Sequence, residues 1–259
     1  MSEFLTSLQN PKIKQLLALQ TKSSLRRESG LFPVEGVREL QHCIDAGFEV
    51  DSIFHCPALL QDFTMPSGAK VFEVSPELYS KIAYRESTEG IIAEVRYKEL
   101  GLDDLKLKEN PLIVVLESVE KPGNLGAVLR SADAAGADAV IVCDPLTDLY
   151  NPNLIRASIG SIFTKQVVTC TSGQAIDWLK QKNIRIYTAQ LQDSEWYYDT
   201  DMKTGTAIVL GTEATGLTDK WREAADAHIK IPMLGSLDSL NVSVSAAILL
   251  FEAVRQRNG

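Results

Sequence analysis

Short apolar runs alternate with helical patterns from residue 111 to the end of the sequence. The first run, Pro111 to Leu116, contains no polar residue, which is typical of a strand buried on both faces of a parallel sheet. Further strands are predicted at 139–143, 166–170, 185–189, 206–210 and 229–231, with helices at 125–135, 154–163, 173–182 and 242–256. This alternation predicts an α/β fold with an open, mostly parallel sheet covered by helices on both sides.

The first 95 residues predict a smaller α/β unit. One or two short amphipathic helices with a basic face precede residue 30, strands are expected at 31–34, 50–55, 70–74 and 90–95, and a helix at 37–46. The stretch 96–110 is polar and has little apolar periodicity after Leu105, as is typical of a link between domains. We therefore predict two domains, 1–105 and 106–259.

Charge, apolar runs and cysteine content argue against several classes of protein. The net charge of −8 argues against a surface that is basic all over, although five basic and only two acidic residues lie within the first 30. No apolar run approaches the roughly 18 residues that span a bilayer, and the start shows no secretory pattern. The four cysteines are scattered, so the cytoplasm is the expected compartment. The His–Cys pairs at 42–43 and 55–56 lack zinc-site spacing, and no metal is expected.

A first polar constellation, residues 117–126, follows the strand at 111–116 and opens a helix. Ligands of open α/β sheets bind at such carboxyl ends of strands. Gly123 and Gly126 are expected to allow a tight turn and a close backbone approach. Arg130 falls away from the buried stripe of the helix, so periodicity alone predicts a surface arginine. The G-x-x-G spacing, with Asp144 further on, only half matches a dinucleotide-binding fingerprint.

Two more constellations follow later strands. Residues 208–217 run from a strand into a turn of small residues around Glu213, which either caps a helix or serves in a site. Residues 231–245 are polar and turn-forming, and Ser239 or Asn241 is a candidate N-cap of the last helix. That helix is apolar nearly all round, which predicts burial against its own domain or against a second subunit.

Taken together, these constellations resemble a known family in their order and spacing. Pro122-Gly-Asn-Leu-Gly to Arg130, Leu210-Gly-Thr-Glu to Gly216-Leu217, and Ile231-Pro-Met to Ser239-Leu-Asn-Val-Ser243 are similar to the three motifs of the SpoU (TrmH-type) branch of the SPOUT RNA methyltransferases. The intervening segment 157–163 also fits. The first domain resembles, more loosely, a small ribosomal-protein-like α/β domain. In this family such a domain often lies N-terminal to the catalytic domain and binds RNA.

The resemblance implies a deep trefoil knot in the C-terminal domain and S-adenosylmethionine as cofactor. It also implies a homodimer whose interface includes the last helix. Each subunit would contribute about half of the target pocket. The implied reaction is methyl transfer to a ribose 2′-hydroxyl of structured rRNA or tRNA. The implied cofactor contacts are Leu210, Gly211, Ile231, Met233 and Leu240, and the implied catalytic residues are Asn124, Arg130, Glu213, Ser239 and Asn241. The implied RNA contacts are Lys12, Lys14, Lys22, Arg26 and Arg27.

An arginine is an awkward base because its guanidinium stays protonated. We therefore expect Arg130 to bind the phosphate and ribose and to lower the pKa of the hydroxyl. Asn124 would orient the ribose or Arg130, Glu213 would hold Arg130 or its loop, and Ser239 and Asn241 would shape the ribose pocket.

Other interpretations remain open from the sequence. A non-catalytic RNA-binding or ribosome-assembly protein could keep the same fold, and a nicotinamide-dependent enzyme is the third alternative. Trp178 is expected in the core, whereas Trp196 to Tyr198 form a candidate surface for base stacking. The sequence names neither the RNA nor the modified nucleotide.

Overall fold

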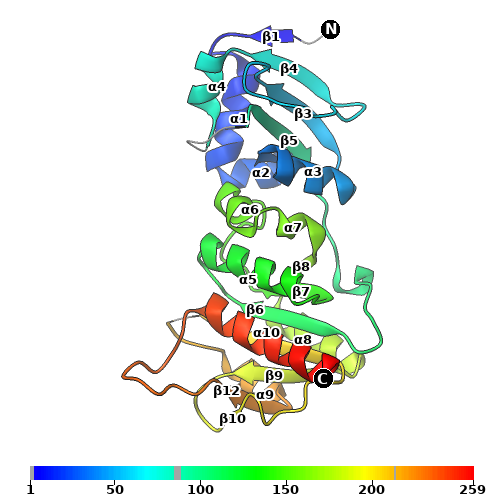
Figure 1. The fold of residues 1–259 in the computed structure, drawn as a ribbon, viewed down its shortest axis with the longest axis vertical. Coiled ribbons are helices and arrows are strands. Elements are labelled where there is room, and N and C mark those ends of the chain that lie inside the picture. The colour runs from blue at the N-terminus through cyan, green and yellow to red at the C-terminus, as the bar shows by residue number, and fades with distance from the viewer. Residues whose placement is uncertain (1–2, 85–88, 213) are drawn as a thin grey trace. The chain divides into compact units, whose positions relative to one another are not determined.

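A computed structural model describes residues 3–84, 89–212 and 214–259 (Figure 1). The chain forms two compact units, one of Met1–Lys98 with Asp148–Thr164 and the other of Glu99–Thr147 with Lys165–Gly259. The predicted division at residue 105 differs from these units mainly in the segment 148–164, which packs with the first unit. Over the described ranges, none of the helices has both the length and the apolar character that a membrane span needs.

The first unit contains a five-stranded sheet in the order β1-β4-β3-β5-β2. Its strands are β1 (Glu3–Leu5), β2 (Leu31–Glu35), β3 (Val50–His55), β4 (Lys70–Val74) and β5 (Ile91–Arg96), and its helices are α1 (Pro11–Thr21), α2 (Ser23–Ser29), α3 (Val37–Asp45), α4 (Pro76–Ile82), α6 (Pro152–Ser158) and α7 (Ser161–Thr164). Strand β5 runs antiparallel to both neighbours, whereas β1, β4 and β3 are mutually parallel.

Buried contacts explain why the segment 148–164 belongs to the first unit. The guanidinium of Arg26, only 2% exposed, donates to Asp148 at 2.6 Å. The ring of Phe32 on β2 stacks on Tyr150 with centroids 4.1 Å apart, and Phe163 lies against the same ring. A buried ion pair and a shared aromatic cluster hold residues that the sequence pattern assigned to the second domain.

Glu94 is a buried carboxyl group within this sheet. Its side chain lies on β5, is 3% exposed, and accepts hydrogen bonds through Oε2 from Ser52 (2.9 Å) and Gln15 (3.0 Å). Burial raises the pKa of Glu94 from 4.5 to about 7. The folded state therefore binds this proton more tightly than the unfolded chain does. Its stabilising effect is complete below about pH 4.5 and is lost as the pH rises through about 7.

Replacing Glu94 with glutamine should raise the stability of the protein above neutral pH. The glutamine keeps the shape of the side chain but needs no proton, and the shifted pKa corresponds to about 3 kcal/mol of unfolding free energy. Glu94→Gln should melt several degrees above the wild type at about pH 8 and close to it at about pH 5. Thermal unfolding followed by circular dichroism across this range measures the difference. A difference independent of pH would contradict the assignment.

The second unit contains a seven-stranded sheet in the order β10-β12-β9-β11-β6-β7-β8, with every described pair of strands parallel. The strands are β6 (Leu112–Glu117), β7 (Ala139–Cys143), β8 (Gln166–Cys170), β9 (Arg185–Ala189), β10 (Glu195–Trp196), β11 (Thr206–Leu210) and β12 (Ala227–Lys230). The helices are η1 (Leu102–Asp104), α5 (Pro122–Ala134), α8 (Ser172–Gln181), α9 (Asp219–Ala224) and α10 (Val242–Asn258). The predicted α/β fold with a mostly parallel sheet is therefore confirmed.

Helices cover both faces of this sheet. Ile113, Val115 and Ile141 point to one face, where they pack with Trp178 of α8 and Trp221 of α9. Figure 1 shows α5 and α10 side by side, and these two helices pack against each other and against β7 and β11. Strand β6 is therefore buried on both sides, as its apolar sequence predicts.

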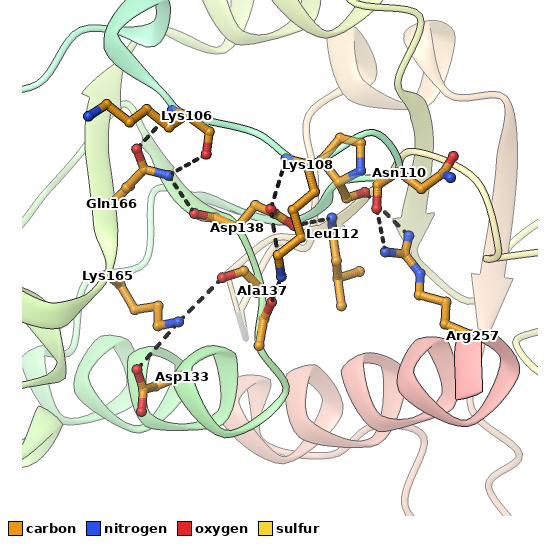
Figure 2. A network of polar contacts seen from close by, with 12 residues as sticks. Lys106, Lys108, Asn110, Leu112, Asp133, Ala137, Asp138, Lys165, Gln166 and Arg257 are labelled. Atoms are coloured by element: carbon orange, nitrogen blue, oxygen red, sulfur yellow. Dashed lines mark hydrogen bonds and ion pairs between the residues drawn. The ribbon is translucent and has the colours of Figure 1, made fainter. Parts of the chain in front are cut away.

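The residues before β6 are fixed to the second unit rather than forming a loose link (Figure 2). The carboxylate of Asp138 accepts from the backbone N–H groups of Lys108 (3.2 Å) and Leu112 (2.9 Å). Arg257, near the end of α10, donates to the carbonyl oxygens of Asn110 (2.8 Å) and Pro111 (3.3 Å). Burial lowers the pKa of Arg257. These bonds hold the end of α10 at the start of β6.

Most elements lie where the sequence predicts them, with a few differences. Helix α5 begins at Pro122, not at Leu125, so Gly123 lies in its first turn. The predicted helix 154–163 divides into α6 and α7, because Ile159 and Gly160 adopt left-handed backbone angles (φ 53° and 80°). The short elements β1, α4, η1, β10 and α9 were not predicted.

Candidate active site

A cavity of about 350 Å³ opens at the carboxyl ends of β9, β11 and β12. Its walls come from the segments that follow these three strands and from the start of α10. The five residues predicted to contact a cofactor all line it: Leu210, Gly211, Ile231, Met233 and Leu240. Ala189, the last residue of β9, and the three residues after it, 190–192, also line it and were not predicted. The shared edge of parallel strands is the signal that would have included them.

One wall is a tight loop, residues 211–217, here named the cavity loop. Thr212 and Gly216 form a β-bridge, with each backbone N–H donating to the carbonyl of the other (3.2 and 3.0 Å). A Cβ on Gly211 would lie 2.3 Å from the carbonyl carbon and oxygen of Gly216, so only glycine fits there. Glu213 lies outside the described residues.

Asn124 and Asn241 bring the first and third constellations together. The side-chain amide of Asn241 donates to Oδ1 of Asn124 at 3.2 Å, across 117 residues of sequence. Asn241 is also the N-cap of α10 and accepts from the backbone N–H of Ser243 at 3.0 Å. Ser239 lines the cavity, and its hydroxyl donates to Asp238 at 3.3 Å. Of these three polar side chains only Ser239 lines the cavity, whereas Asn241 lies between two lining residues, Leu240 and Val242, and Asn124 contacts Asn241.

Arg130 is exposed on α5 and is absent from the residues that line the cavity of its own chain. Gly123 was expected to lie in a tight turn, and this prediction is wrong. It lies within α5 rather than in a tight turn, and a Cβ there would meet nothing within 4 Å. The first turn of α5 thus presents open space beside Asn124, and no contact with the described residues requires a glycine at this point.

The described residues include no group of three or more His, Cys, Asp or Glu side chains placed to hold a metal ion. Cys143 and Cys170 are register partners on β7 and β8, and both thiols are free. The contact with Cys170 and burial raise the pKa of Cys143. This thiol therefore stays protonated at neutral pH.

Comparison with known families identifies the two parts of the chain. The profile of the SpoU rRNA Methylase family matches residues 111–251, which contain the cavity and all three constellations. The chain belongs to the SpoU rRNA methylase family. The profile of the MRM3-like substrate binding domain matches residues 10–93 of this SpoU-family chain.

Named relatives of this SpoU methylase span nearly its whole length. It is 30% identical to the 23S rRNA (uridine(2479)-2'-O)-methyltransferase of Streptomyces viridochromogenes, over 96% of this chain and 91% of that one. It is 29% identical to the 23S rRNA (guanosine(2553)-2'-O)-methyltransferase of Bacillus subtilis, over 95% and 96%. The crystal structure of an AdoMet-bound rRNA methyltransferase from Sinorhizobium meliloti has a TM-score of 0.89, 28% identity and 98% coverage of both chains.

The residues predicted to contact RNA divide into two groups. Lys14, Lys22 and Arg27 are exposed on or beside α1 and α2, and Lys12 is partly exposed and pairs with Glu3 at 2.6 Å. The prediction for Arg26 is wrong, because its side chain is buried and its charge is paired with Asp148. A helical basic pattern does not distinguish such a buried arginine from its exposed neighbours.

The aromatic residues of the SpoU methylase lie as expected. Trp178 is 5% exposed within the core. Trp196 is 40% exposed, its ring stacks on Tyr198 with centroids 6.4 Å apart, and the ammonium of Lys230 lies 4.8 Å from its centroid. Base stacking at this exposed platform stays a prediction.

Sequence reasoning missed a buried polar cluster next to the cavity loop. Glu117, the last residue of β6, is 3% exposed and accepts hydrogen bonds from Thr218, and the hydroxyl oxygen of Ser172 lies 3.1 Å from its Oε1. Asp144, considered above for a dinucleotide ribose, instead accepts from the hydroxyl (2.6 Å) and backbone N–H (3.1 Å) of Ser172 at the start of α8. The sequence could have indicated the buried role of Glu117, because a carboxylate at the end of an apolar, buried strand needs hydrogen-bond donors around it.

Proposed function

We propose that this protein transfers the methyl group of S-adenosylmethionine to a ribose 2′-hydroxyl of rRNA. The contact between Asn124 and Asn241 beside the cavity carries the proposal. It joins a polar site on α5 to the pocket formed by the other two constellations. The two relatives named above, whose names specify 23S rRNA 2′-O-methylation, support the reaction and the substrate class.

The cofactor is S-adenosylmethionine, and the cavity fits it. Apolar side chains of Leu210, Ile231 and Leu249 line the pocket, and Gly211, Thr212 and Gly216 of the cavity loop line it as well. When bound, the cofactor supplies an activated methyl group on a sulfonium centre. The residues of the chain then have to position the ribose oxygen and handle its proton.

Each of the polar residues has a separate role in positioning the ribose oxygen or in handling its proton. Asn124, held by Asn241, orients the ribose beside the pocket, and Ser239 shapes the pocket rim. Arg130 binds the phosphate and ribose, and its positive charge favours the ionised form of the 2′-hydroxyl. Glu213 holds Arg130 or the cavity loop. These assignments follow the family resemblance position by position.

The sharpest test is a methylation assay with defined acceptors. The purified protein, S-adenosylmethionine and unmodified 23S rRNA, assembly intermediates or tRNA are incubated, and 2′-O-methyl positions are mapped. We expect one methylated ribose in rRNA. Modification of tRNA alone would reassign the substrate. Cofactor binding without transfer to any acceptor would favour the alternative, a non-catalytic RNA-binding protein. The base stays open, since one relative is named for uridine and another for guanosine.

We assign rRNA binding to the first unit, which matches a substrate-binding domain, and place the reaction in the cytoplasm. Lys14, Lys22 and Arg27 present three exposed positive charges there. Each phosphate contact contributes to the salt dependence of binding because it releases counterions.

Reversing these three charges should weaken the binding of rRNA fragments, whatever the nucleotide sequence of the fragment. For the triple variant Lys14→Glu, Lys22→Glu, Arg27→Glu, we expect a loss of about tenfold or more and a shallower plot of log affinity against log salt. Filter binding between low and moderate salt measures both. Affinity for S-adenosylmethionine serves as the control and should not change. An unchanged salt slope would remove these residues from the RNA interface.

The homodimer is supported by an exposed apolar stripe on α10. Val244 and Phe251 are 46% and 48% exposed, and the partly exposed Ala247 and Ile248 lie between them on the same face. An apolar stripe on a helix that also packs on α5 is suited to a second copy of the chain.

Phe251→Asp should convert the dimer to a monomer, because it replaces the largest apolar side chain of this stripe with a charge. Size-exclusion chromatography with light scattering gives the mass. The matched control is Asp177→Lys, a charge reversal at an exposed position of α8, which should leave the dimer intact. A Phe251→Asp protein that stays dimeric would locate the interface elsewhere.

The deep trefoil knot is also part of this proposal. Its support is that the cavity loop, the segment 231–241 and the start of α10 surround one cavity, as the motif-bearing loops of knotted family members do. A crystal structure in which the crossings between residues 206 and 242 can be followed tests it, and an unthreaded path would exclude it.

A further inference from the structure

We propose that Glu117 is a positioning residue that holds the cavity loop in the shape that binds S-adenosylmethionine. This inference rests on the proposed function.

Glu117 is unusual for its position. It ends β6, a strand whose other five residues are apolar, and only 3% of it is exposed. A carboxylate buried without partners is strongly unfavourable, so its environment must supply donors. Thr218 supplies two of them: its backbone N–H donates to Oε2 at 2.8 Å and its hydroxyl to Oε1 at 2.7 Å. Hydrogen bonds to a charged acceptor are stronger than neutral ones.

Thr218 is the residue that directly follows the cavity loop. The loop therefore has two fixed ends, one at β11 and one at the carboxylate of Glu117, with the bridge between Thr212 and Gly216 in between. Thr218 is also the N-cap residue of α9, yet its side chain makes no capping hydrogen bond. Its hydroxyl donates to Glu117 instead. A threonine that gives up the usual cap contact indicates that the position of the loop end is what these bonds serve.

The carboxylate of Glu117 also contacts α8. The hydroxyl of Ser172, at the start of α8, lies 3.1 Å from Oε1 of Glu117 and 2.6 Å from Asp144, so these two carboxylates share its one proton. The hydroxyl oxygen accepts from the buried indole N–H of Trp221 at 3.1 Å. Trp221 belongs to α9, which follows Thr218. The same carboxylate thus contacts both α8 and the loop end, so rotation of the Glu117 side chain would break contacts on two sides.

The expected consequence concerns binding rather than chemistry. If the cavity loop leaves its binding shape for part of the time, the apparent affinity for the cofactor falls by that fraction, while the fully bound protein is unaffected. Thr218 does not line the cavity, so a change at this residue acts through the cavity loop and α9 rather than by contact with the cofactor. We expect the dissociation constant to rise about tenfold with little change in turnover at saturating cofactor.

Thr218→Val is the decisive variant, since it keeps the branched shape and the backbone donor but removes the hydroxyl. Thr218→Ser keeps the hydroxyl, Glu117→Gln replaces the charge, and Thr169→Val is a matched change at an exposed threonine of β8. Calorimetric titration with S-adenosylmethionine gives the affinity. Hydrogen exchange of the backbone amides in residues 211–218, measured without cofactor, reports the loop directly.

We expect weaker binding and faster loop exchange in Thr218→Val and Glu117→Gln, and near-wild-type values in Thr218→Ser and Thr169→Val. Wild-type affinity and exchange in a folded Thr218→Val would overturn the proposal, even if Glu117→Gln fails to fold. The exchange measurement also separates the two proposals. A wild type that binds no S-adenosylmethionine would contradict the proposed function, whereas unchanged exchange in Thr218→Val contradicts only the role of Glu117.

Discussion

Replacing Gly211 with alanine should weaken the binding of S-adenosylmethionine about a hundredfold. The added Cβ would lie 2.3 Å from the carbonyl carbon and oxygen of Gly216, far inside contact distance, and both residues line the cavity. Because those contacts are backbone atoms, a side-chain rotation cannot relieve them, and the cavity loop must open. Such overpacking costs about 1–3 kcal/mol, which corresponds to a loss of about 5- to 150-fold in affinity.

Calorimetry at constant temperature measures this loss. The control is Gly173→Ala in the first turn of α8, where a Cβ would meet nothing within 4 Å. That variant should bind the cofactor like the wild type and should be no less stable, since alanine favours helix more than glycine does. Wild-type affinity in Gly211→Ala would mean that the cofactor lies away from the cavity loop.

Five of the seven described strands of the second unit could be predicted to within one residue. Parallel strands buried on both faces have no polar side to vary, so runs such as Leu112–Glu117 and Thr206–Leu210 stand out from their surroundings. Strand β10 has only two residues, both exposed, and its pairing with β12 leaves no pattern in the sequence. Such an element exists because of its neighbour, and local sequence does not encode it.

The candidate site could be predicted in part. The five cofactor residues line one cavity because each lies at or beyond the carboxyl end of β11 or β12, a relation that the order of elements already contains. The burial of Arg26 could not be predicted, since it depends on Asp148, which is 122 residues away. The role of Glu117 likewise depends on Thr218, 101 residues away. Long-range polar pairs are the part of a site that periodicity does not report.

Replacing Arg130 with alanine should reduce turnover about 10²- to 10³-fold and leave cofactor affinity unchanged. Removal of a positive group that stabilises developing negative charge on the ribose oxygen has an effect of this size. Cofactor affinity should be unaffected, because Arg130 does not line the cavity. Single-turnover methylation of rRNA measures the rate, and calorimetry serves as the control. Near-normal turnover would exclude Arg130 from the chemistry.

Mixed dimers can locate the site in which Arg130 acts. Arg130 is exposed on α5, beside the helix that carries the proposed dimer stripe, which suits a role in the pocket of the partner. Differently tagged Arg130→Ala and Gly211→Ala chains, each inactive alone, are co-expressed. If Arg130 serves the partner's pocket, the mixed dimer combines an intact cavity with an intact arginine. About one quarter of wild-type activity should then return in an unseparated mixture. If Arg130 acts within its own chain, no mixed dimer has a complete site, and activity stays absent.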